Sequence, residues 1–176
     1  TACHNPHSSP RPKLLPTEER ELCVKCHTPI QDRTASPAKV HRPVADGCLA
    51  CHRPHGAKNN MMLTAEQPAL CLDCHENINE LVSAAKVQHA PMKSAESCAA
   101  CHDPHASKED GLLAKPQKDG CLSCHAKEFV EGERKIRNIG EILAANPHAH
   151  GPVGDGNCAA CHNPHGGDQP GAGAAA

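Results

Sequence analysis

The hydrophobic pattern of the chain predicts short helices separated by long irregular stretches. A helix capped and opened by residues 17–20 is expected to run into residues 23–27, and residues 76–87 (ENINELVSAAKV) are typical of a helix of about three turns. The best amphipathic pattern places apolar residues on one helical face and stops at an Asn-Pro pair: Ile136, Ile139, Leu143, then Asn146 and Pro147. Elsewhere 16 prolines and 13 glycines favour loops, and no strand pattern persists. We therefore expect a mostly irregular fold with short α-helices.

The composition indicates that the polypeptide alone cannot build a hydrophobic core. Leu, Ile, Val and Phe account for 25 of the 176 residues, and the chain has one Phe, no Tyr and no Trp. Such a low apolar fraction leaves too little buried surface to offset the conformational entropy lost on folding. The formal net charge is only -2, so the chain lacks the high net charge that usually accompanies such a low apolar fraction in disordered proteins. We expect the bare chain to be unfolded and the core to come from something other than side chains.

A repeated Cys-x-x-Cys-His motif supplies a candidate for that core. The motif occurs six times, and the chain opens with the last four residues of a seventh copy. This pattern is the attachment signature of c-type haem, in which two thiols bind one porphyrin and the histidine ligates its iron. The thioether candidates are Cys3, Cys23, Cys26, Cys48, Cys51, Cys71, Cys74, Cys98, Cys101, Cys121, Cys124, Cys158 and Cys161. The proximal ligand candidates are His4, His27, His52, His75, His102, His125 and His162. No thiol is left over, so the sequence predicts seven haems c.

Three other uses of paired cysteines fit the sequence less well. A disulfide framework does not require a histidine after every second cysteine. Zinc sites use C-x-x-C pairs but need no Cys-His adjacency. A thioredoxin-like C-x-x-C expects a single motif in a βαβ context, which the pattern lacks.

The motifs alternate between two kinds within a longer repeat. First-kind motifs continue as Cys-His-x-Pro-His, and three of the four follow an upstream His-x-Pro, whereas second-kind motifs lack the Pro-His extension. The intervals from a first-kind motif to the next second-kind motif are always 20 residues, with a leucine at a fixed place in each: Leu15, Leu63 and Leu113. The intervals leading to the next first-kind motif vary, at 22, 24 and 34 residues. The repeat units are approximately 1–38, 39–86, 87–145 with an insert at 127–146, and an incomplete 146–176 in a single multihaem chain. We expect the insert helix to pack over a haem, with partner docking as the alternative.

This repeat resembles the doubled C-x-x-C-H family of multihaem c-type cytochromes. The resemblance covers nearly the whole chain and departs at the truncated start, the insert and the missing second-kind motif after His165. It implies an elongated repeat array with a haem core. The family's periplasmic carriers and outer-membrane conduits imply a periplasmic or extracellular location. The partners expected are other redox proteins or copies of the chain, with an outer-membrane porin-type protein as a further alternative. The 18 Lys and Arg residues form no block, so nucleic acid is not an expected partner.

Eight histidines lie outside the motifs, and seven of them occupy repeat positions suited to distal iron ligands. These seven are His7, His41, His55, His89, His105, His150 and His165, while His148 is an alternative to His150. A histidine three residues past a proximal ligand cannot easily reach its own iron, and the intervening proline aims it at the next haem. The expected distal–proximal pairs are His7–His27, His55–His75, His105–His125, His41–His52, His89–His102 and His150–His162. This scheme leaves His165, and the iron of His4, without partners. Met61, Met62 and Met92 are interpreted as packing residues rather than ligands.

Iron ligated by two histidines has no open position for a substrate and exchanges only electrons. The sequence therefore predicts electron transfer along closely spaced haems, and a subunit of an extracellular cytochrome filament is one form of this function. The alternative is a multihaem reductase for nitrite, hydroxylamine or tetrathionate, which needs one open iron. Haem c is attached outside the cytoplasmic membrane, yet neither a signal peptide nor a transmembrane run appears, so a processed chain or a fragment is expected.

Overall fold

The computed structural model describes residues 2–35 and 38–169, and the chain forms two compact units. The first unit comprises Thr1–Leu70 and Asp103–Leu112, and the second comprises Cys71–His102 and Leu113–Ala176. The third first-kind motif is divided between them, since His102 belongs to the second unit and Asp103 to the first. The units therefore do not follow the repeats of the sequence.

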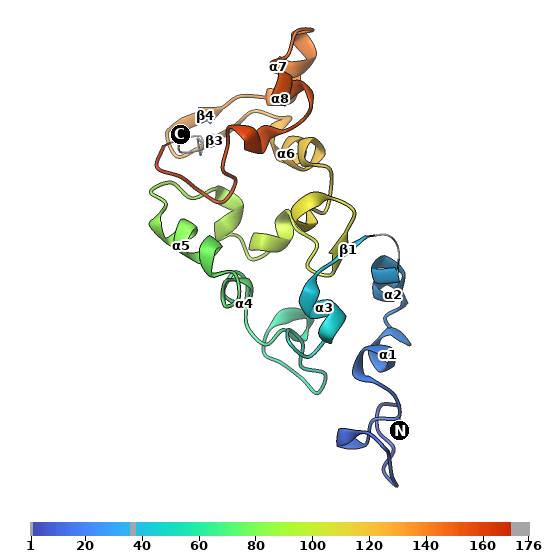
Figure 1. Cartoon of the computed structure of the whole chain (residues 1–176). Helices are drawn as coiled ribbons and strands as arrows, with labels where there is room; N and C mark the ends of the chain where they lie inside the picture. The colour runs from blue at the N-terminus through green and yellow to red at the C-terminus, as the bar shows by residue number, and fades with distance from the viewer. Residues whose placement is uncertain (1, 36–37, 170–176) are drawn as a thin grey trace. The chain divides into compact units, whose positions relative to one another are not determined.

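The first unit contains short helices and one small sheet, and no element exceeds eight residues in the part that the structure describes (Figure 1). Its helices are α1 (Glu19–Val24), α2 (Thr28–Ala35) and α3 (Arg42–Asp46), with 3-10 turns η1 (Pro12–Leu14), η2 (Asn60–Met62) and η5 (Asp110–Leu112). Its strands are β1 (Lys39–Val40) and β2 (Ala106–Ser107). Helix α4 (Ala69–Leu72) runs over the boundary between the units.

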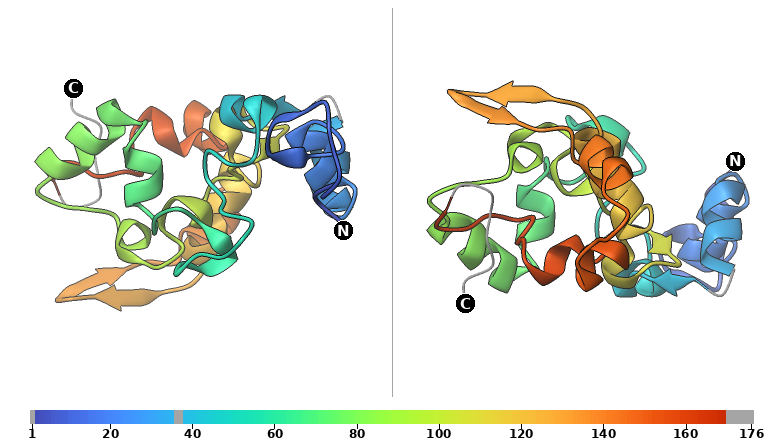
Figure 2. Two further views of the ribbon diagram at one scale, coloured as in Figure 1. Left: turned by 90° about the horizontal axis from the view of Figure 1, so that it is seen from below. Right: turned by 90° about the horizontal axis from the view of Figure 1, so that it is seen from above.

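The second unit carries the insert and a hairpin that extends away from the helices beside it (Figure 2). Its helices are α5 (Glu76–Ala84), α6 (Gln117–His125), α7 (Ile139–Ala145) and α8 (Gly151–Gly154), with 3-10 turns η3 (Ala90–Lys93), η4 (Ser97–Ala100) and η6 (Cys158–Ala160). Strands β3 (Phe129–Glu131) and β4 (Arg134–Ile136) are antiparallel, with Phe129 opposite Ile136.

The helix predictions are largely confirmed, but the prediction that no strands form is wrong. Helix α1 begins at Glu19 and α5 covers most of residues 76–87. The insert helix α7 begins at Ile139, because Ile136 belongs to β4 instead. Asn138 caps α7 by accepting a hydrogen bond from the Glu141 N–H. The hairpin turns at Gly132, whose φ of +60° suits glycine.

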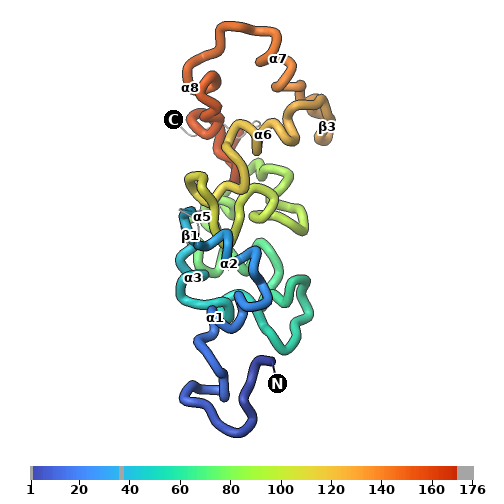
Figure 3. The backbone as a smooth tube through the Cα atoms, turned by 90° about the vertical axis from the view of Figure 1, so that its right-hand side faces the viewer, coloured from blue at the N-terminus to red at the C-terminus, as the bar shows by residue number. Residues whose placement is uncertain are grey.

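Side chains do not form a hydrophobic core within the residues that the structure describes. Only Ser97, Ala106, Gly156 and Gly166 are buried there, and Ser97 has the largest fully buried side chain. Long loops connect the short elements, as the backbone trace shows (Figure 3). Among residues 2–35 and 38–169, no helix is long and apolar enough to cross a membrane. The fold thus agrees with the irregular, helix-poor class predicted from the sequence.

Candidate functional site

Each complete Cys-x-x-Cys-His motif forms one helical turn. In five of the six copies, the histidine N–H donates to the carbonyl of the first cysteine at 2.9–3.1 Å, and the sixth copy lies within α6. Positions i, i+3 and i+4 share one face of a helical turn. Both cysteines and the histidine therefore face one side, as attachment of a single porphyrin requires. The structure joins none of the thirteen cysteines to another in a disulfide.

In two first-kind motifs, the ring of the motif histidine contacts a left-handed turn. His52 Nδ1 lies 2.9 Å from the carbonyl oxygen of Met61, and His4 Nδ1 lies 2.7 Å from that of Lys13. Met61 and Met62 both have φ of 55°, and Lys13 and Leu14 have φ of 58° and 57°. An N–H at Nδ1 bonded to a carbonyl leaves Nε2 with the lone pair that a metal needs.

The same turn explains the leucine found in every 20-residue interval. His52 and Leu63 form an antiparallel bridge, as do His102 and Leu113. Arg53 N donates to the carbonyl of Met62 at 2.8 Å, closing the loop. Met61 is 72 % exposed and Met62 is 44 % exposed with respect to other parts of the chain, so the packing role predicted for these two methionines stays a prediction. Their contribution is backbone geometry, which side-chain patterns do not reveal.

Four pairs of histidine rings lie close together among residues 2–35 and 38–169. The ring centres are 6.2 Å apart in His52–His105, 6.1 Å in His102–His165 and 6.2 Å in His89–His125, with interplanar angles of 8°, 9° and 15°. His4 and His55 form a fourth pair at 5.8 Å and 31°. Two metal–imidazole bonds of about 2.0 Å each, with each ring centre about one bond length behind its nitrogen, add to roughly 6 Å. The pairs therefore fit two axial ligands on one haem iron.

Burial favours the neutral imidazole in these pairs. It lowers the pKa of His105, His125 and His165, and the charge of the facing ring acts in the same direction in each case. At His105 the carboxylate of Asp103 opposes this effect. Neutral imidazole is the form that ligates iron.

The histidine ring pairs differ from the expected scheme because each repeat contacts the following repeat. Strand β1, which leads into His41, pairs with β2, directly after His105, and His41 Nδ1 lies 2.9 Å from the carbonyl oxygen of Pro104. In the second unit Val87 pairs with Gly167, and His89 Nδ1 lies 3.1 Å from the carbonyl oxygen of Pro164. The upstream His-x-Pro segment of one repeat thus binds the Pro-His segment of the next repeat.

Three expected partners are therefore wrong, and a fourth is displaced. His55 faces His4 rather than His75, His105 faces His52 rather than His125, and His89 faces His125 rather than His102. Since His105 occupies the position opposite His52, His41 is not the partner of that ring. His165 and the ring of His4, for which no partner was expected, have one each. The pairs His7–His27 and His150–His162 stay predictions; His150 precedes α8 as its capping residue.

Cysteines of successive motifs also meet. Burial, followed by the neighbouring Cys23 thiol, raises the pKa of Cys48 to about 11, and burial with Cys158 raises the pKa of Cys121 to about 11. A hydrogen bond with Cys71 lowers the pKa of Cys98 to about 6. Each contact joins the first cysteine of a second-kind motif to the first cysteine of the following first-kind motif.

Side chains four residues before the second-kind motif support two of these contacts. Glu19 Oε1 accepts the N–H groups of Cys48 at 2.7 Å and Leu49 at 3.0 Å. Gln117 Oε1 accepts the N–H of Ala159 at 3.1 Å. The same junction therefore forms across intervals of different length.

The insert contributes the only aromatic residue of the chain to one ring pair. Phe129 of β3 lies 5.6 Å from the ring of His125, at an interplanar angle of 52°. The sequence predicted that the insert covers a haem, but it assigned that role to the helix and not to the hairpin. The sequence signal that could have revealed the hairpin is the glycine Gly132 between Phe129 and Ile136, which pair across the two strands.

Comparison with known families identifies the repeat. A family model described as the doubled CXXCH motif matches residues 1–32, 41–80, 89–129 and 150–176, which is more than half of the chain. No curated protein matches the chain. The four matched segments contain the four first-kind motifs and all three second-kind motifs.

Proposed function

Because the chain belongs to the doubled CXXCH motif family of multihaem c-type cytochromes, we propose that it carries seven covalent haems and passes electrons between them. Haem c supplies a one-electron couple whose potential is tuned by its axial ligands and their surroundings. The thirteen cysteines would hold the porphyrins, and the seven motif histidines would serve as proximal ligands. The porphyrins would also provide the core that the side chains lack.

The observation that carries this proposal is the set of facing imidazoles. Rings about 6 Å apart and nearly parallel leave room for one iron between them and none for a substrate. Ligation by two histidines, without methionine, favours low reduction potentials. These features support electron exchange as the chemistry of the chain.

Contacts between thiols support a path from haem to haem. A cysteine anchors one edge of its porphyrin, so the contacts Cys23–Cys48, Cys71–Cys98 and Cys121–Cys158 would bring edges of different porphyrins together. Redox proteins would donate and accept the electrons. Attachment of haem c outside the cytoplasmic membrane makes a periplasmic or extracellular location part of this proposal.

Mass and ligand binding test the proposal together. The intact holoprotein should show a mass increase of seven haems, and its reduced form should leave carbon monoxide unbound at every iron with two histidine ligands. A mass below six haems contradicts the attachment scheme. Turnover of nitrite or hydroxylamine, with carbon monoxide bound by more than one haem, would favour a reductase.

A further inference from the structure

The turn before His105 carries a negative charge that the matching turns lack. In the sequence His-x-Pro-His, the variable residue is Asn5, Arg53, Asp103 or Asn163. Asn5, Asp103 and Asn163 each accept the N–H of the following histidine through a side-chain oxygen, at 3.2, 3.0 and 3.1 Å. This Asx turn sets the direction of the Pro-His segment. Since asparagine forms it twice, the turn does not require the charge of Asp103.

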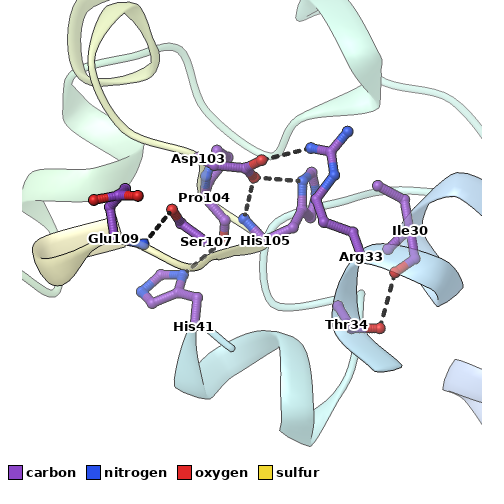
Figure 4. A network of polar contacts seen from close by, with 9 residues as sticks. All are labelled: Ile30, Arg33, Thr34, His41, Asp103, Pro104, His105, Ser107 and Glu109. Carbon is purple, nitrogen blue, oxygen red and sulfur yellow. Dashed lines mark hydrogen bonds and ion pairs between the residues drawn. The ribbon is translucent and has the colours of Figure 1, made fainter. Parts of the chain in front are cut away.

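The Asp103 carboxylate lies beside the ring of His105 and is held there from α2. Its Oδ1 atom lies 3.7 Å from His105 Nδ1, and its Oδ2 atom lies 2.6 Å from Arg33 Nη1 (Figure 4). The side chain of Asp103 is only 17 % exposed, so water screens its charge poorly. The charged or titratable groups that act on His105 are Asp103, His52, Arg33 and His41.

We propose that Asp103, oriented by Arg33, is a positioning residue that lowers the reduction potential of the haem between His52 and His105. The inference rests on the proposed function and extends it to one haem. A negative charge near Nδ1 makes the ligand nitrogen more electron-rich and stabilises the more positive, oxidised iron. Arg33 offsets part of this charge while fixing its position.

The His102–His165 pair provides an internal reference. Its rings have nearly the same separation and angle as those of His52–His105, but its turn residue is the neutral Asn163. Charge at the turn residue is therefore a clear difference between two closely similar ring pairs. The charged copy should have the lower potential.

The experiment is a spectroelectrochemical titration of the holoprotein and its variants. Asp103→Asn keeps the Asx turn and should move a single-haem fraction of the absorbance change to a more positive potential. Arg33→Gln removes the offsetting charge and should move the same fraction to a more negative potential. Asn163→Asp should move a different single-haem fraction to a more negative potential. Low-spin spectra should remain unchanged in all three variants.

Asp110→Asn is the matched control, because Asp110 forms an ion pair with Lys39 in the same unit but its side chain is 97 % exposed. This variant should leave the titration unchanged. If Asp103→Asn behaves like Asp110→Asn, or if it produces a high-spin haem, the inference is overturned and Asp103 has only a structural role. Protein without covalent haem would instead overturn the proposed function and this inference with it.

Discussion

First-kind and second-kind motifs build their ring pairs from different parts of the chain. The first-kind histidines His52 and His102 face His105 and His165, which follow the first-kind motif of the next repeat. The second-kind histidine His125 faces His89, which belongs to its own repeat. First-kind pairs thus link one repeat to the next, whereas the second-kind pair closes a repeat on itself. The ring pairs thus join parts of the chain that lie far apart in sequence, where the described residues form no apolar core.

The two kinds of interval follow the same division. The constant 20-residue interval contains the left-handed turn, whose hydrogen bonds fix the number of residues. The interval from a second-kind motif to the next first-kind motif needs only to bring two cysteines together. It therefore accepts the insert with its hairpin and α7.

Removing one histidine of a ring pair should have the largest effect, and it tests whether first-kind and second-kind pairs differ as described. His105→Ala should open the iron of His52, and His89→Ala should open the iron of His125, because each removes the opposing ring. Each variant should show one high-spin haem and bind one equivalent of carbon monoxide. Site assignment by paramagnetic NMR should identify the iron. His148→Ala is the control, and an open iron at His125 in His105→Ala would restore the pairing expected from sequence.

Shortening the constant interval should destabilise the protein more than shortening the variable one. Deletion of residues 58–60 should remove the His52–Met61 contact and the bonds Arg53–Met62 and Thr64–Cys51, for a loss of about 3 kcal/mol at about 1 kcal/mol each. Deletion of residues 130–135, which is twice as long, removes most of the hairpin but none of these bonds. Denaturant unfolding of both holoproteins measures the difference, and equal losses would contradict the division between intervals.

Removing the side chain that supports a cysteine contact should have an intermediate effect. Glu19→Ala leaves two N–H groups without their charged acceptor, and we expect a loss of roughly 2 kcal/mol in the free energy of unfolding. Gln117→Ala removes one neutral hydrogen bond and should cost about 1 kcal/mol. Denaturant unfolding again provides the measurement. A larger loss for Gln117→Ala would show that the two junctions are not equivalent.

Sequence patterns predicted the attachment motifs, the repeat and the short helices, because each depends on neighbouring residues. They did not predict the ring partners, since the pairing of β1 with β2 brings together residues more than sixty positions apart. The proline after Asp103 was interpreted as directing His105 away from the iron of its own motif, and the ring pairs agree with this. The expected partner His125 was wrong, because His105 lies opposite His52. The left-handed turn at Met61 was missed because methionine rarely adopts that conformation, and no glycine marks the position.

Substitutions in the left-handed turn should change the free energy of unfolding least, but whether they raise or lower it is clearly predicted. Met61 has φ of 55°, where a non-glycine residue costs about 1–2 kcal/mol, and glycine loses part of this advantage through its unfolded-state entropy. Met61→Gly should therefore raise the free energy of unfolding of the holoprotein by about 0.5–1 kcal/mol, while Met61→Ile should lower it by about 1 kcal/mol.

The third repeat supplies the reverse control, because Gly111 already occupies this conformation with φ of 62°. Gly111→Ala meets no atom within 4 Å, so its expected loss of about 1 kcal/mol would come from backbone strain alone. Destabilisation by Met61→Gly would mean that the exposed methionine side chain packs against the haem, and that the turn is not limited by its backbone conformation.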